Sequence, residues 1–338
     1  MKKYNVSVVG ATGLVGSEII KVLEETKFPI NILLPLASKN SIGKKIEFKK
    51  SLIQVEELTT ESFKNIDITL FSAGGSISAK FADAAVKSGA IVIDNTSHFR
   101  MDKDVPLIVP EVNPQDLKDH KGIIANPNCS TAQLVLPLKP IHDKYKIKRI
   151  VVDTYQATSG AGKAAMDELM KQTASILNGE GATAAEKFTR QIAFNLIPQI
   201  DTFTDNGFTK EEMKMTNETK KILGDNSIEL VATCVRVPVF IGHSEAVHIE
   251  TEKFFDINDI TKIISDMPNL KIMDEPNNQV YPTPLDCIET NDTLIGRIRR
   301  DFTINNGISM FIVSNNLRKG AALNAVQIAQ RLIKDKLI

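Results

Sequence analysis

Residues 7–16 read S-V-V-G-A-T-G-L-V-G and decide the fold of the first half of the chain. Gly10, Gly13 and Gly16 form a G-x-x-G-x-x-G pattern directly after a short apolar segment that we expect to be a buried strand. Residues 17–25 then carry apolar side chains on one side, which predicts a helix. Glycines permit the tight turn between the two, and the helix start offers unpaired amides to phosphate. The stretch therefore predicts a dinucleotide-binding strand–turn–helix unit.

The same alternation continues through the first half of the chain. Short apolar runs that predict strands are separated by amphipathic stretches that predict helices. Further strands are expected at 32–37, 66–72, 91–95 and 123–126, and a helix near 79–88. Such alternation implies a parallel sheet with helices on both faces, so we expect an α/β fold with a Rossmann-type N-terminal domain.

The pattern changes near Lys146. The segments 147–155, 228–237, 245–254 and 293–313 are rich in strand-forming residues, and several alternate apolar with polar side chains. That alternation is typical of antiparallel strands with one solvated face. Helices are expected at 163–177 and 256–267, which predicts an α+β second domain. The last amphipathic helix, 321–333, follows Gly320, a residue that we expect to let the chain return to the first domain.

These patterns predict two domains. We expect a first domain over residues 1–128, completed by a C-terminal helical segment, 317–338. The second domain is expected over 129–316. Acidic and basic residues alternate along 210–221, and we expect this stretch to be a solvated face except at Glu211 and Lys214, discussed below.

Composition narrows the function classes. The 338 residues contain 41 Lys plus Arg and 41 Asp plus Glu, so the net charge is zero and no basic excess points to nucleic acid. No apolar run is long enough to predict a membrane span, and the N-terminus lacks the pattern of a signal peptide. The three cysteines are odd in number and form no C-x-x-C pair, so neither a metal site nor a disulfide is predicted. We therefore expect a cytoplasmic enzyme.

The end of the second expected strand indicates which dinucleotide binds. An NAD site usually places an acid there, but this chain has A-S-K-N-S at residues 37–41. Hydroxyl and amide groups could hold a 2′-phosphate that a carboxylate would repel, which favours NADP. We expect the cofactor to contact Gly10, Thr12, Gly13, Leu14, Val15, Ser38, Asn40, Ser41 and Ser72.

A candidate nucleophile follows the last expected strand of the first domain. Residues 126–131 read N-P-N-C-S-T, which places Cys129 at the start of an expected helix. A helix N-terminus stabilises a thiolate, and its amides with the Asn128 side chain could hold an oxyanion. Cys234 and Cys287 lack such a setting, and we expect them to be ordinary buried residues.

Five motifs in order now give a resemblance that covers the chain from end to end. They are G-A-T-G-L-V-G, S-A-G-G-S, N-P-N-C-S-T, Q-A-T-S-G-A-G and R-V-P-V-F-I-G-H-S-E. Together they resemble the aspartate-semialdehyde dehydrogenases. The resemblance implies a second domain of the glyceraldehyde-3-phosphate dehydrogenase type and a homodimer packed through it. It also implies reduction of aspartyl phosphate by NADPH to aspartate semialdehyde and phosphate, toward lysine, threonine and methionine.

The same resemblance implies the site residues. Cys129 would carry the acyl group as a thioester, Gln156 would orient it, and His243 would be the acid/base, with a near-neutral pKa suited to that task. Arg236 would bind the substrate carboxylate. Glu211 would bind its amino group, and the phosphate contacts would be Arg100 and Lys214. Further cofactor contacts are implied at Ser159, Gly160, Gly162 and Asn316.

Three alternatives remain. An acyl-phosphate reductase acting on an N-acetylated glutamyl chain shares the fold and the cysteine, but R-V-P-V followed by G-H-S-E favours the aspartyl family. A glyceraldehyde-3-phosphate dehydrogenase would be expected to carry an acid after the second strand. A non-catalytic NADP sensor would need only the glycine loop. It would not explain why Cys129, Gln156 and His243 occur in their motifs.

Overall fold

The computed structural model describes residues 2–338, which divide into two compact units. The first unit runs to Asn128 and includes Ala321–Ile338. The second unit is Cys129–Gly320, so residues 317–320 lie in it. Within residues 2–338, every helix is too short or too polar to span a lipid bilayer.

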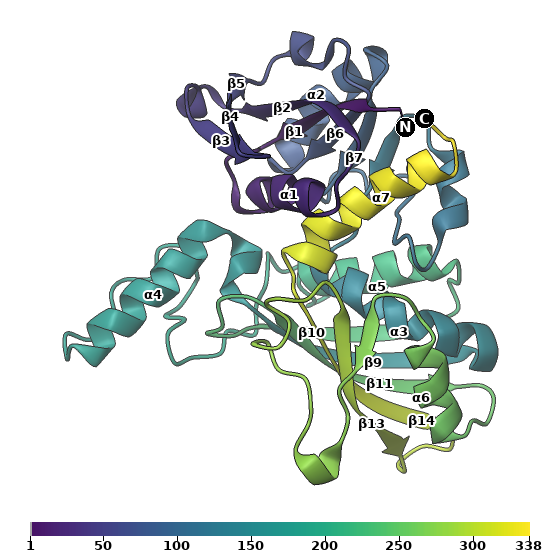
Figure 1. The fold of residues 1–338 in the computed structure, drawn as a ribbon. Coiled ribbons are helices and arrows are strands. Elements are labelled where there is room, and N and C mark those ends of the chain that lie inside the picture. The colour runs from purple at the N-terminus through teal and green to yellow at the C-terminus, as the bar shows by residue number, and fades with distance from the viewer. Residues whose placement is uncertain (1) are drawn as a thin grey trace. The chain divides into compact units, whose positions relative to one another are not determined.

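The first unit contains a six-stranded parallel sheet in the order β5-β2-β1-β6-β7-β8 (Figure 1). All-parallel pairing requires crossover connections, which the helices and loops between strands supply. This is the α/β arrangement expected from the strand–helix alternation. The strands are β1 (Tyr4–Val9), β2 (Ile30–Ala37), β5 (Glu56–Glu57), β6 (Ile68–Phe71), β7 (Ile91–Asp94) and β8 (Ile123–Ala125).

Helices cover both faces of this sheet, as predicted. On one face α1 (Leu14–Glu25) and the C-terminal helix α7 (Leu323–Lys334) share a buried apolar cluster with β1. On the other face α2 (Gly75–Lys87) packs in a second cluster with Phe63 and Phe71. The strands are buried on both sides, which explains why they read as continuous apolar runs. A short hairpin, β3 (Lys45–Phe48) with β4 (Ser51–Gln54), follows β2.

The second unit contains a six-stranded mixed sheet in the order β10-β9-β11-β14-β13-β12. The two edge pairs, β9 with β10 and β12 with β13, are parallel, and the other neighbours are antiparallel. The purely antiparallel expectation is wrong at both edges, because long connections join the parallel strands. The strands are β9 (Ile147–Gln156), β10 (Glu229–Arg236), β11 (His243–Thr251), β12 (Leu270–Ile272), β13 (Thr293–Asp301) and β14 (Gly307–Ser314).

Three helices pack on this sheet around one core cluster. They are α3 (Cys129–Tyr145), α5 (Lys210–Leu223) and α6 (Ile257–Ser265), while α4 (Lys163–Leu177) extends away from the sheet (Figure 1). The strand burial patterns alternate as expected for a sheet with one covered face.

The charged stretch 210–221 is not simply a solvated face. It forms α5, whose capping box joins Thr209 and Glu212. Glu212 also accepts from the Cys234 amide over 3.0 Å, so it ties the helix to β10. Glu218 is 1% exposed. The expectation fails because capping and tertiary hydrogen bonds satisfy these acids inside the protein.

Candidate active site

The glycine loop of the first unit joins β1 to α1 at the carboxyl edge of the sheet. Gly10 has a φ of +84°, and a Cβ on Gly16 would lie 2.1 Å from the Gly10 carbonyl oxygen. The Gly13 amide donates to that oxygen over 2.9 Å. A side chain at Gly16 would force the turn open, so the glycines hold the start of α1 close to the end of β1.

Two further loops reach the same edge. The Ser41 hydroxyl, beyond β2, lies 3.3 Å from the Thr12 hydroxyl. The Ser72 hydroxyl, beyond β6, donates to the Val9 carbonyl over 3.1 Å. The strand order changes direction between β1 and β6, and open α/β sheets bind ligands at such a switch point. The structure therefore brings three of the expected cofactor contacts to one place.

The start of α1 suits an anionic cofactor. The helix follows Gly13 with no side-chain cap and no acid in its first turn among the described residues, and it opens with the half-buried Leu14 and Val15. Uncapped amides and the positive helix end attract a pyrophosphate. Ser38 and Asn40 are exposed beyond β2. The sequence analysis missed Glu56–Glu57, which β5 places beside the end of β2, because pairing across 19 or more residues leaves no local signal.

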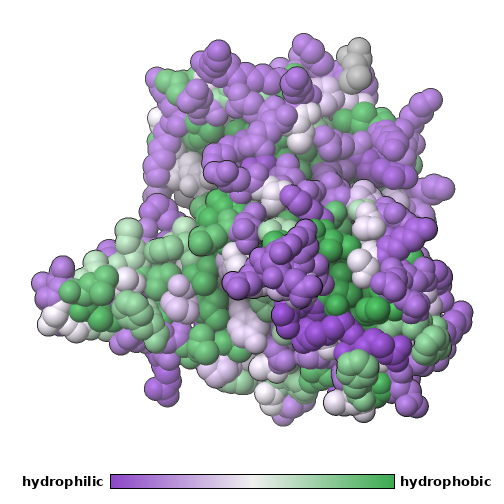
Figure 2. Space-filling view, turned by 60° about the horizontal axis from the view of Figure 1, so that its bottom comes forward, coloured by the Kyte–Doolittle hydropathy of each residue, from purple (hydrophilic) through white to green (hydrophobic). Residues whose placement is uncertain are grey.

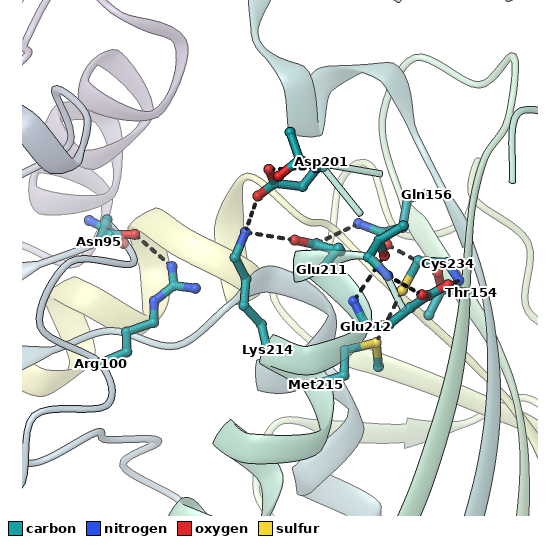
Figure 3. Close-up of polar contacts among 12 residues, drawn as sticks. Asn95, Arg100, Thr154, Gln156, Asp201, Glu211, Glu212, Lys214, Met215 and Cys234 are labelled. Atoms are coloured by element: carbon teal, nitrogen blue, oxygen red, sulfur yellow. Dashed lines mark hydrogen bonds and ion pairs between the residues drawn. The ribbon is translucent and has the colours of Figure 1, made fainter. Parts of the chain in front are cut away.

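Arg100 and Asn128 also belong to the first unit. The Arg100 guanidinium is 7% exposed and donates to the carbonyls of Asn95 over 2.8 Å and Asn126 over 2.9 Å (Figure 3). These carbonyls follow β7 and β8, so Arg100 is held at the carboxyl ends of both strands. Asn128 is 6% exposed and is the last residue before Cys129.

In the second unit, three strands bring predicted residues to one end of the sheet. Gln156 ends β9, and Arg236 ends β10 directly opposite it in the parallel register. His243 begins β11, whose Ser244 pairs with Tyr155 of β9 in antiparallel register. The three side chains are therefore neighbours although 87 residues separate the first from the last, as expected for ends of adjacent strands.

Cys129 is the first residue of α3 and the one partly exposed cysteine of the three. Burial raises the pKa of Cys234 strongly and that of Cys287 to about 12, so both are inert thiols at neutral pH. A Cβ on Gly320 would lie 2.6 Å from the Cys129 Cβ. Gly320 is therefore required by its close approach to Cys129, a reason that differs from the expected chain reversal.

The ring of His243 is completely buried and held in one tautomer. The Ala157 amide donates to its Nδ1 over 3.0 Å, so that nitrogen carries a lone pair and the neutral ring carries its proton on Nε2. Nε2 has no hydrogen-bond partner within residues 2–338. A buried N–H group without a hydrogen-bond partner lowers the stability of the fold. Nε2 is therefore a candidate donor to a bound ligand.

The expectation of a near-neutral His243 is wrong. Burial lowers its pKa to about 3, Arg236 adds to this effect, and Glu211 opposes it. The resting ring is therefore neutral across the physiological range. It can donate a hydrogen bond from Nε2, but it is not a charged acid.

Arg236 is 5% exposed and keeps its charge. Its Nη1 donates to the Ala157 carbonyl over 2.6 Å. Burial lowers the pKa of Arg236, and the charge of Glu211 opposes this, as Cys129 and Cys234 do when ionised. An arginine loses its proton only far above neutral pH, so a buried positive charge lies within electrostatic reach of the nucleophile.

A chain of polar contacts links Gln156 to the surface (Figure 3). The Gln156 amide donates to Glu211 over 3.1 Å and accepts from the Thr154 hydroxyl over 3.0 Å. Lys214 donates to Glu211 over 3.1 Å and to Asp201 over 2.9 Å. Burial lowers the pKa of Lys214, but the two carboxylates outweigh it and raise the pKa above its usual value. Lys214 is therefore a fixed cation held between two acids.

The remaining predicted residues build the loops beside His243. Asn316 is 2% exposed, accepts from the Gly242 amide over 2.9 Å and donates to the Ser159 hydroxyl over 2.9 Å. A Cβ on Gly160 would lie 2.9 Å from Arg236 Nη1 and 3.2 Å from His243 Nε2. Gly162 has a φ of +90° and precedes α4.

The sequence analysis missed four residues of this region. Thr154 and Asp201 orient Gln156 and Lys214, and they lie in stretches without a motif. Gln133 and Glu245 are buried polar residues near Cys129 and His243 in the chain. Glu245 left a signal, since it occupies an inward position of an alternating strand.

This arrangement can support acyl transfer. A thiol at a helix start, a buried Nε2–H donor and a guanidinium lie in one unit, and they provide a nucleophile, an oxyanion partner and an anion binder. Among residues 2–338, no group of three or more His, Cys, Asp or Glu residues could hold a metal ion.

Two family models match the chain. The semialdehyde dehydrogenase NAD binding domain matches residues 5–120, and the semialdehyde dehydrogenase dimerisation domain matches residues 138–319. The aspartate-semialdehyde dehydrogenase of Aquifex aeolicus is 52% identical, with 99% of each chain covered. That of Bacillus subtilis is 50% identical, again with 99% of each chain covered.

Comparison with solved structures points to the same family. Aspartate semialdehyde dehydrogenase II of Vibrio cholerae, complexed with ASA, superposes with a TM-score of 0.96 at 48% identity over 99% of each chain. The Candida albicans enzyme with NADP superposes with a TM-score of 0.78 at 27% identity over 100% of each chain. The chain therefore belongs to the aspartate-semialdehyde dehydrogenase family.

Proposed function

We propose that the protein is an NADP-dependent aspartate-semialdehyde dehydrogenase that reduces L-4-aspartyl phosphate through a thioester on Cys129. The observation that carries this proposal is the partly exposed Cys129 at the start of α3, in the unit that gathers His243, Arg236 and Gln156. Full-length relatives of this family support the choice of substrate.

The first step is acyl transfer. The positive end of α3 and the Arg236 charge favour the Cys129 thiolate, which attacks the acyl carbon of aspartyl phosphate. The carbon–sulfur bond forms, the bond to phosphate breaks, and inorganic phosphate leaves. Arg100 and Lys214 are the proposed phosphate contacts, and Asn128 with the first amides of α3 is the proposed oxyanion site.

The second step is reduction of the thioester. Bound NADPH supplies the hydride. The resulting tetrahedral oxyanion accepts a hydrogen bond from Nε2 of neutral His243, whose other nitrogen is fixed by Ala157. Collapse of the oxyanion breaks the carbon–sulfur bond and gives the aldehyde and the thiolate, with no proton transfer required. This role as a hydrogen-bond donor replaces the acid/base role expected from a near-neutral pKa.

Substrate recognition follows from fixed charges. We assign the substrate carboxylate to Arg236, whose planar guanidinium can grip two oxygens, and the amino group to Glu211. The Gln156 amide donates to Glu211. We therefore assign Gln156 to orient the acyl chain between Arg236 and Glu211. A carboxylate on Arg236 would also offset the charge that lowers the pKa of His243.

The first unit is the proposed NADP-binding domain. The glycine loop and the uncapped start of α1 suit the pyrophosphate, with Thr12, Ser41 and Ser72 beside them. Ser38 and Asn40 suit the 2′-phosphate. Ser159, Gly160, Gly162 and Asn316 are the proposed contacts from the second, catalytic domain.

The second unit is also the proposed homodimer interface. Helices α3, α5 and α6 cover one face of its sheet, while Tyr155 of β9 and Phe311 of β14 lie together on the other, with ring centroids 6.3 Å apart. Exposed apolar side chains of this size need a partner surface. Figure 2 shows hydrophobic residues gathered over the part that contains α4. Exposed large hydrophobic residues of this unit include Met170, Leu177, Phe194, Leu196 and Phe203.

The chemistry fits a biosynthetic role in the cytoplasm. A reactive thiol needs a reducing compartment, and the product aldehyde is the precursor that the family supplies for lysine, threonine and methionine.

The test is nicotinamide absorbance with L-aspartate 4-semialdehyde, NADP and phosphate, which runs the reaction in reverse. We expect reduction of NADP that depends on phosphate and is much slower with NAD. Turnover of N-acetylglutamate semialdehyde alone would move the substrate to the rival family. Binding of NADP without turnover of either aldehyde would contradict an enzymatic function.

A further inference from the structure

Glu245 is a buried carboxyl to which the mechanism above gives no task. It lies two residues after His243 on β11, on the same side of the strand, and none of its surface is exposed. Its register partners are Thr154 on β9 and Ile312 on β14, which carry no charge. An acid in such a place needs a cation, a set of hydrogen-bond donors or a proton.

No cation serves Glu245 among the described residues. Salt bridges join Lys and Arg to other acids, and the buried guanidinium of Arg236 donates to the Ala157 carbonyl and lies under the influence of Glu211. The negative charges of Glu211, Glu212 and Glu245 all raise the pKa of Cys234, so among the described residues this part of the unit has acids but no cation to offset the charge of Glu245. Burial raises the pKa of Glu245 well above its usual value, and only Gln133 opposes this. Full burial without a cation therefore favours the protonated carboxyl.

Gln133 is the neighbour that completes this group. It lies one helical turn after Cys129 on α3 and is fully buried. Its Nε2 donates to the His243 carbonyl over 3.4 Å, while its Oε1 and both oxygens of Glu245 have no partner of normal geometry within residues 2–338. Gln133 is nevertheless close enough to lower the pKa of Glu245 through a side-chain hydrogen bond.

The hydrogen-bond donors and acceptors of Gln133 and Glu245 match only if Glu245 is protonated. Gln133 Oε1 needs a donor, and a carboxylate has none, whereas a carboxylic acid offers one O–H. The second N–H of the same amide can serve the carbonyl oxygen of that acid. A small rotation of either side chain then satisfies every atom of the pair without charge.

We propose that Glu245 is a positioning residue: as a neutral carboxylic acid bonded to the Gln133 amide, it fixes the strand that carries His243 against the helix that begins at Cys129. The inference rests on the proposed roles of Cys129 and His243. Glu245 touches neither substrate nor cofactor in this account. It sets the distance between the nucleophile and the oxyanion partner by holding α3 against β11.

Infrared spectroscopy tests the protonation state without reference to turnover. The spectrum of the wild type minus that of Glu245→Gln should contain the C=O stretch of a protonated carboxylic acid at neutral pH, shifted in D2O. A carboxylate band in its place would overturn the proposal. Because this readout needs no substrate, it stands or fails independently of the proposed function.

Two substitutions at Glu245 test the positioning role. Glu245→Gln keeps both hydrogen bonds without a titratable proton, so kcat should stay within about twofold of the wild type and the pH profile should not move. Glu245→Leu fills similar space without hydrogen bonds, so kcat should fall about tenfold or more while KM changes little. Equal loss in both variants would overturn the role, and so would full activity of Glu245→Leu.

The partner residue supplies a second, independent check. Gln133→Leu should match Glu245→Leu, and the double variant should lose little more than either single one, because all three break the same link. Additive losses would contradict the pairing. Affinity for NADP, whose proposed contacts include neither Gln133 nor Glu245, should stay unchanged in every variant and serves as the control for folding.

Discussion

The two units build their parts of the site in different ways. The first unit uses main chain: Gly10, Gly13 and Gly16 shape a turn, and α1 begins without a side-chain cap on its amides. The second unit uses buried side chains: His243, Arg236 and Gln156 come from three strands and are held by Ala157, Thr154 and Glu211. A main-chain site binds a common cofactor, whereas a side-chain site sets the protonation states that the reaction needs.

The comparison predicts that losses of turnover come from the second unit and losses of cofactor affinity from the first. The largest effect is expected at Cys129. Cys129→Ser should lower kcat at least about a thousandfold, because a hydroxyl is a far weaker nucleophile than a thiolate, while NADP affinity stays normal. Steady-state kinetics and fluorescence titration measure the two. Cys287→Ala, at a buried inert thiol, is the matched control, and equal losses in both would remove Cys129 from its role.

The next effect is expected at His243. His243→Asn removes the Nε2 donor from the oxyanion and should lower kcat about a hundredfold with little change in the KM for NADP. The pH dependence sharpens this, since no step of kcat/KM near pH 6 to 7 should belong to His243 in the free enzyme. An acid limb in that range that disappears in His243→Asn would show a titrating histidine instead.

Gly160→Ala should lower kcat about tenfold, because the new Cβ would lie 2.9 Å from Arg236 Nη1 and 3.2 Å from two atoms of the His243 ring. The denaturation midpoint should change little. Gly75→Ala in the first unit, where the nearest atom would be 3.7 Å away, is the control and should keep normal activity. A fully active Gly160→Ala enzyme would mean that the ring and guanidinium can move without cost.

The buried neutral His243 also predicts how stability depends on pH. Its folded pKa, about 3, lies below the value of 6.5 for an exposed histidine. Between these values the unfolded chain binds a proton that the folded chain does not, so stability is full above pH 6.5 and falls as pH drops toward 3. The slope should be about 1.4 kcal/mol per pH unit in this window. Urea unfolding of the wild type and His243→Asn measures it, and equal slopes in the two would contradict the burial of a neutral ring.

The smallest effect is expected in the first unit. Asn40→Asp places a carboxylate beyond β2 and should weaken NADP binding about threefold or more by repelling the 2′-phosphate, while NAD binding is unchanged or improved. Asn31→Asp, at the exposed start of the same strand, is the control. Equal affinity of Asn40→Asp and the wild type for NADP would place the 2′-phosphate elsewhere.

The sequence predicts the fold of the first unit better than the fold of the second unit. The strands of the first sheet other than β5 were predicted, because period, glycines and apolar runs are local signals. The parallel edges of the second sheet were not, because pairing of β9 with β10 spans about 80 residues and depends on the connection between them.

The site residues show the same difference between local sequence signals and long-range packing. Motifs predict Cys129 and His243 as the reactive residues. The effects that lower the pKa of His243 are burial by surrounding elements and the charge of Arg236, and a local motif does not reveal them. Buried Glu212 looks like a surface charge in the sequence, because its partners are the backbone amides of Thr209 and Cys234. Glu245 ends the motif that contains His243, and Gln133 follows Cys129 by four residues, yet only packing of α3 on β11 places them together.

The most direct test of the central claim is mass spectrometry of the enzyme after reaction with aspartyl phosphate in the absence of cofactor. The account predicts the mass increase of one aspartyl group, located on the peptide of Cys129, removed by NADPH and absent in Cys129→Ser. Normal turnover with no adduct at Cys129, or with the adduct on another residue, would contradict the thioester mechanism.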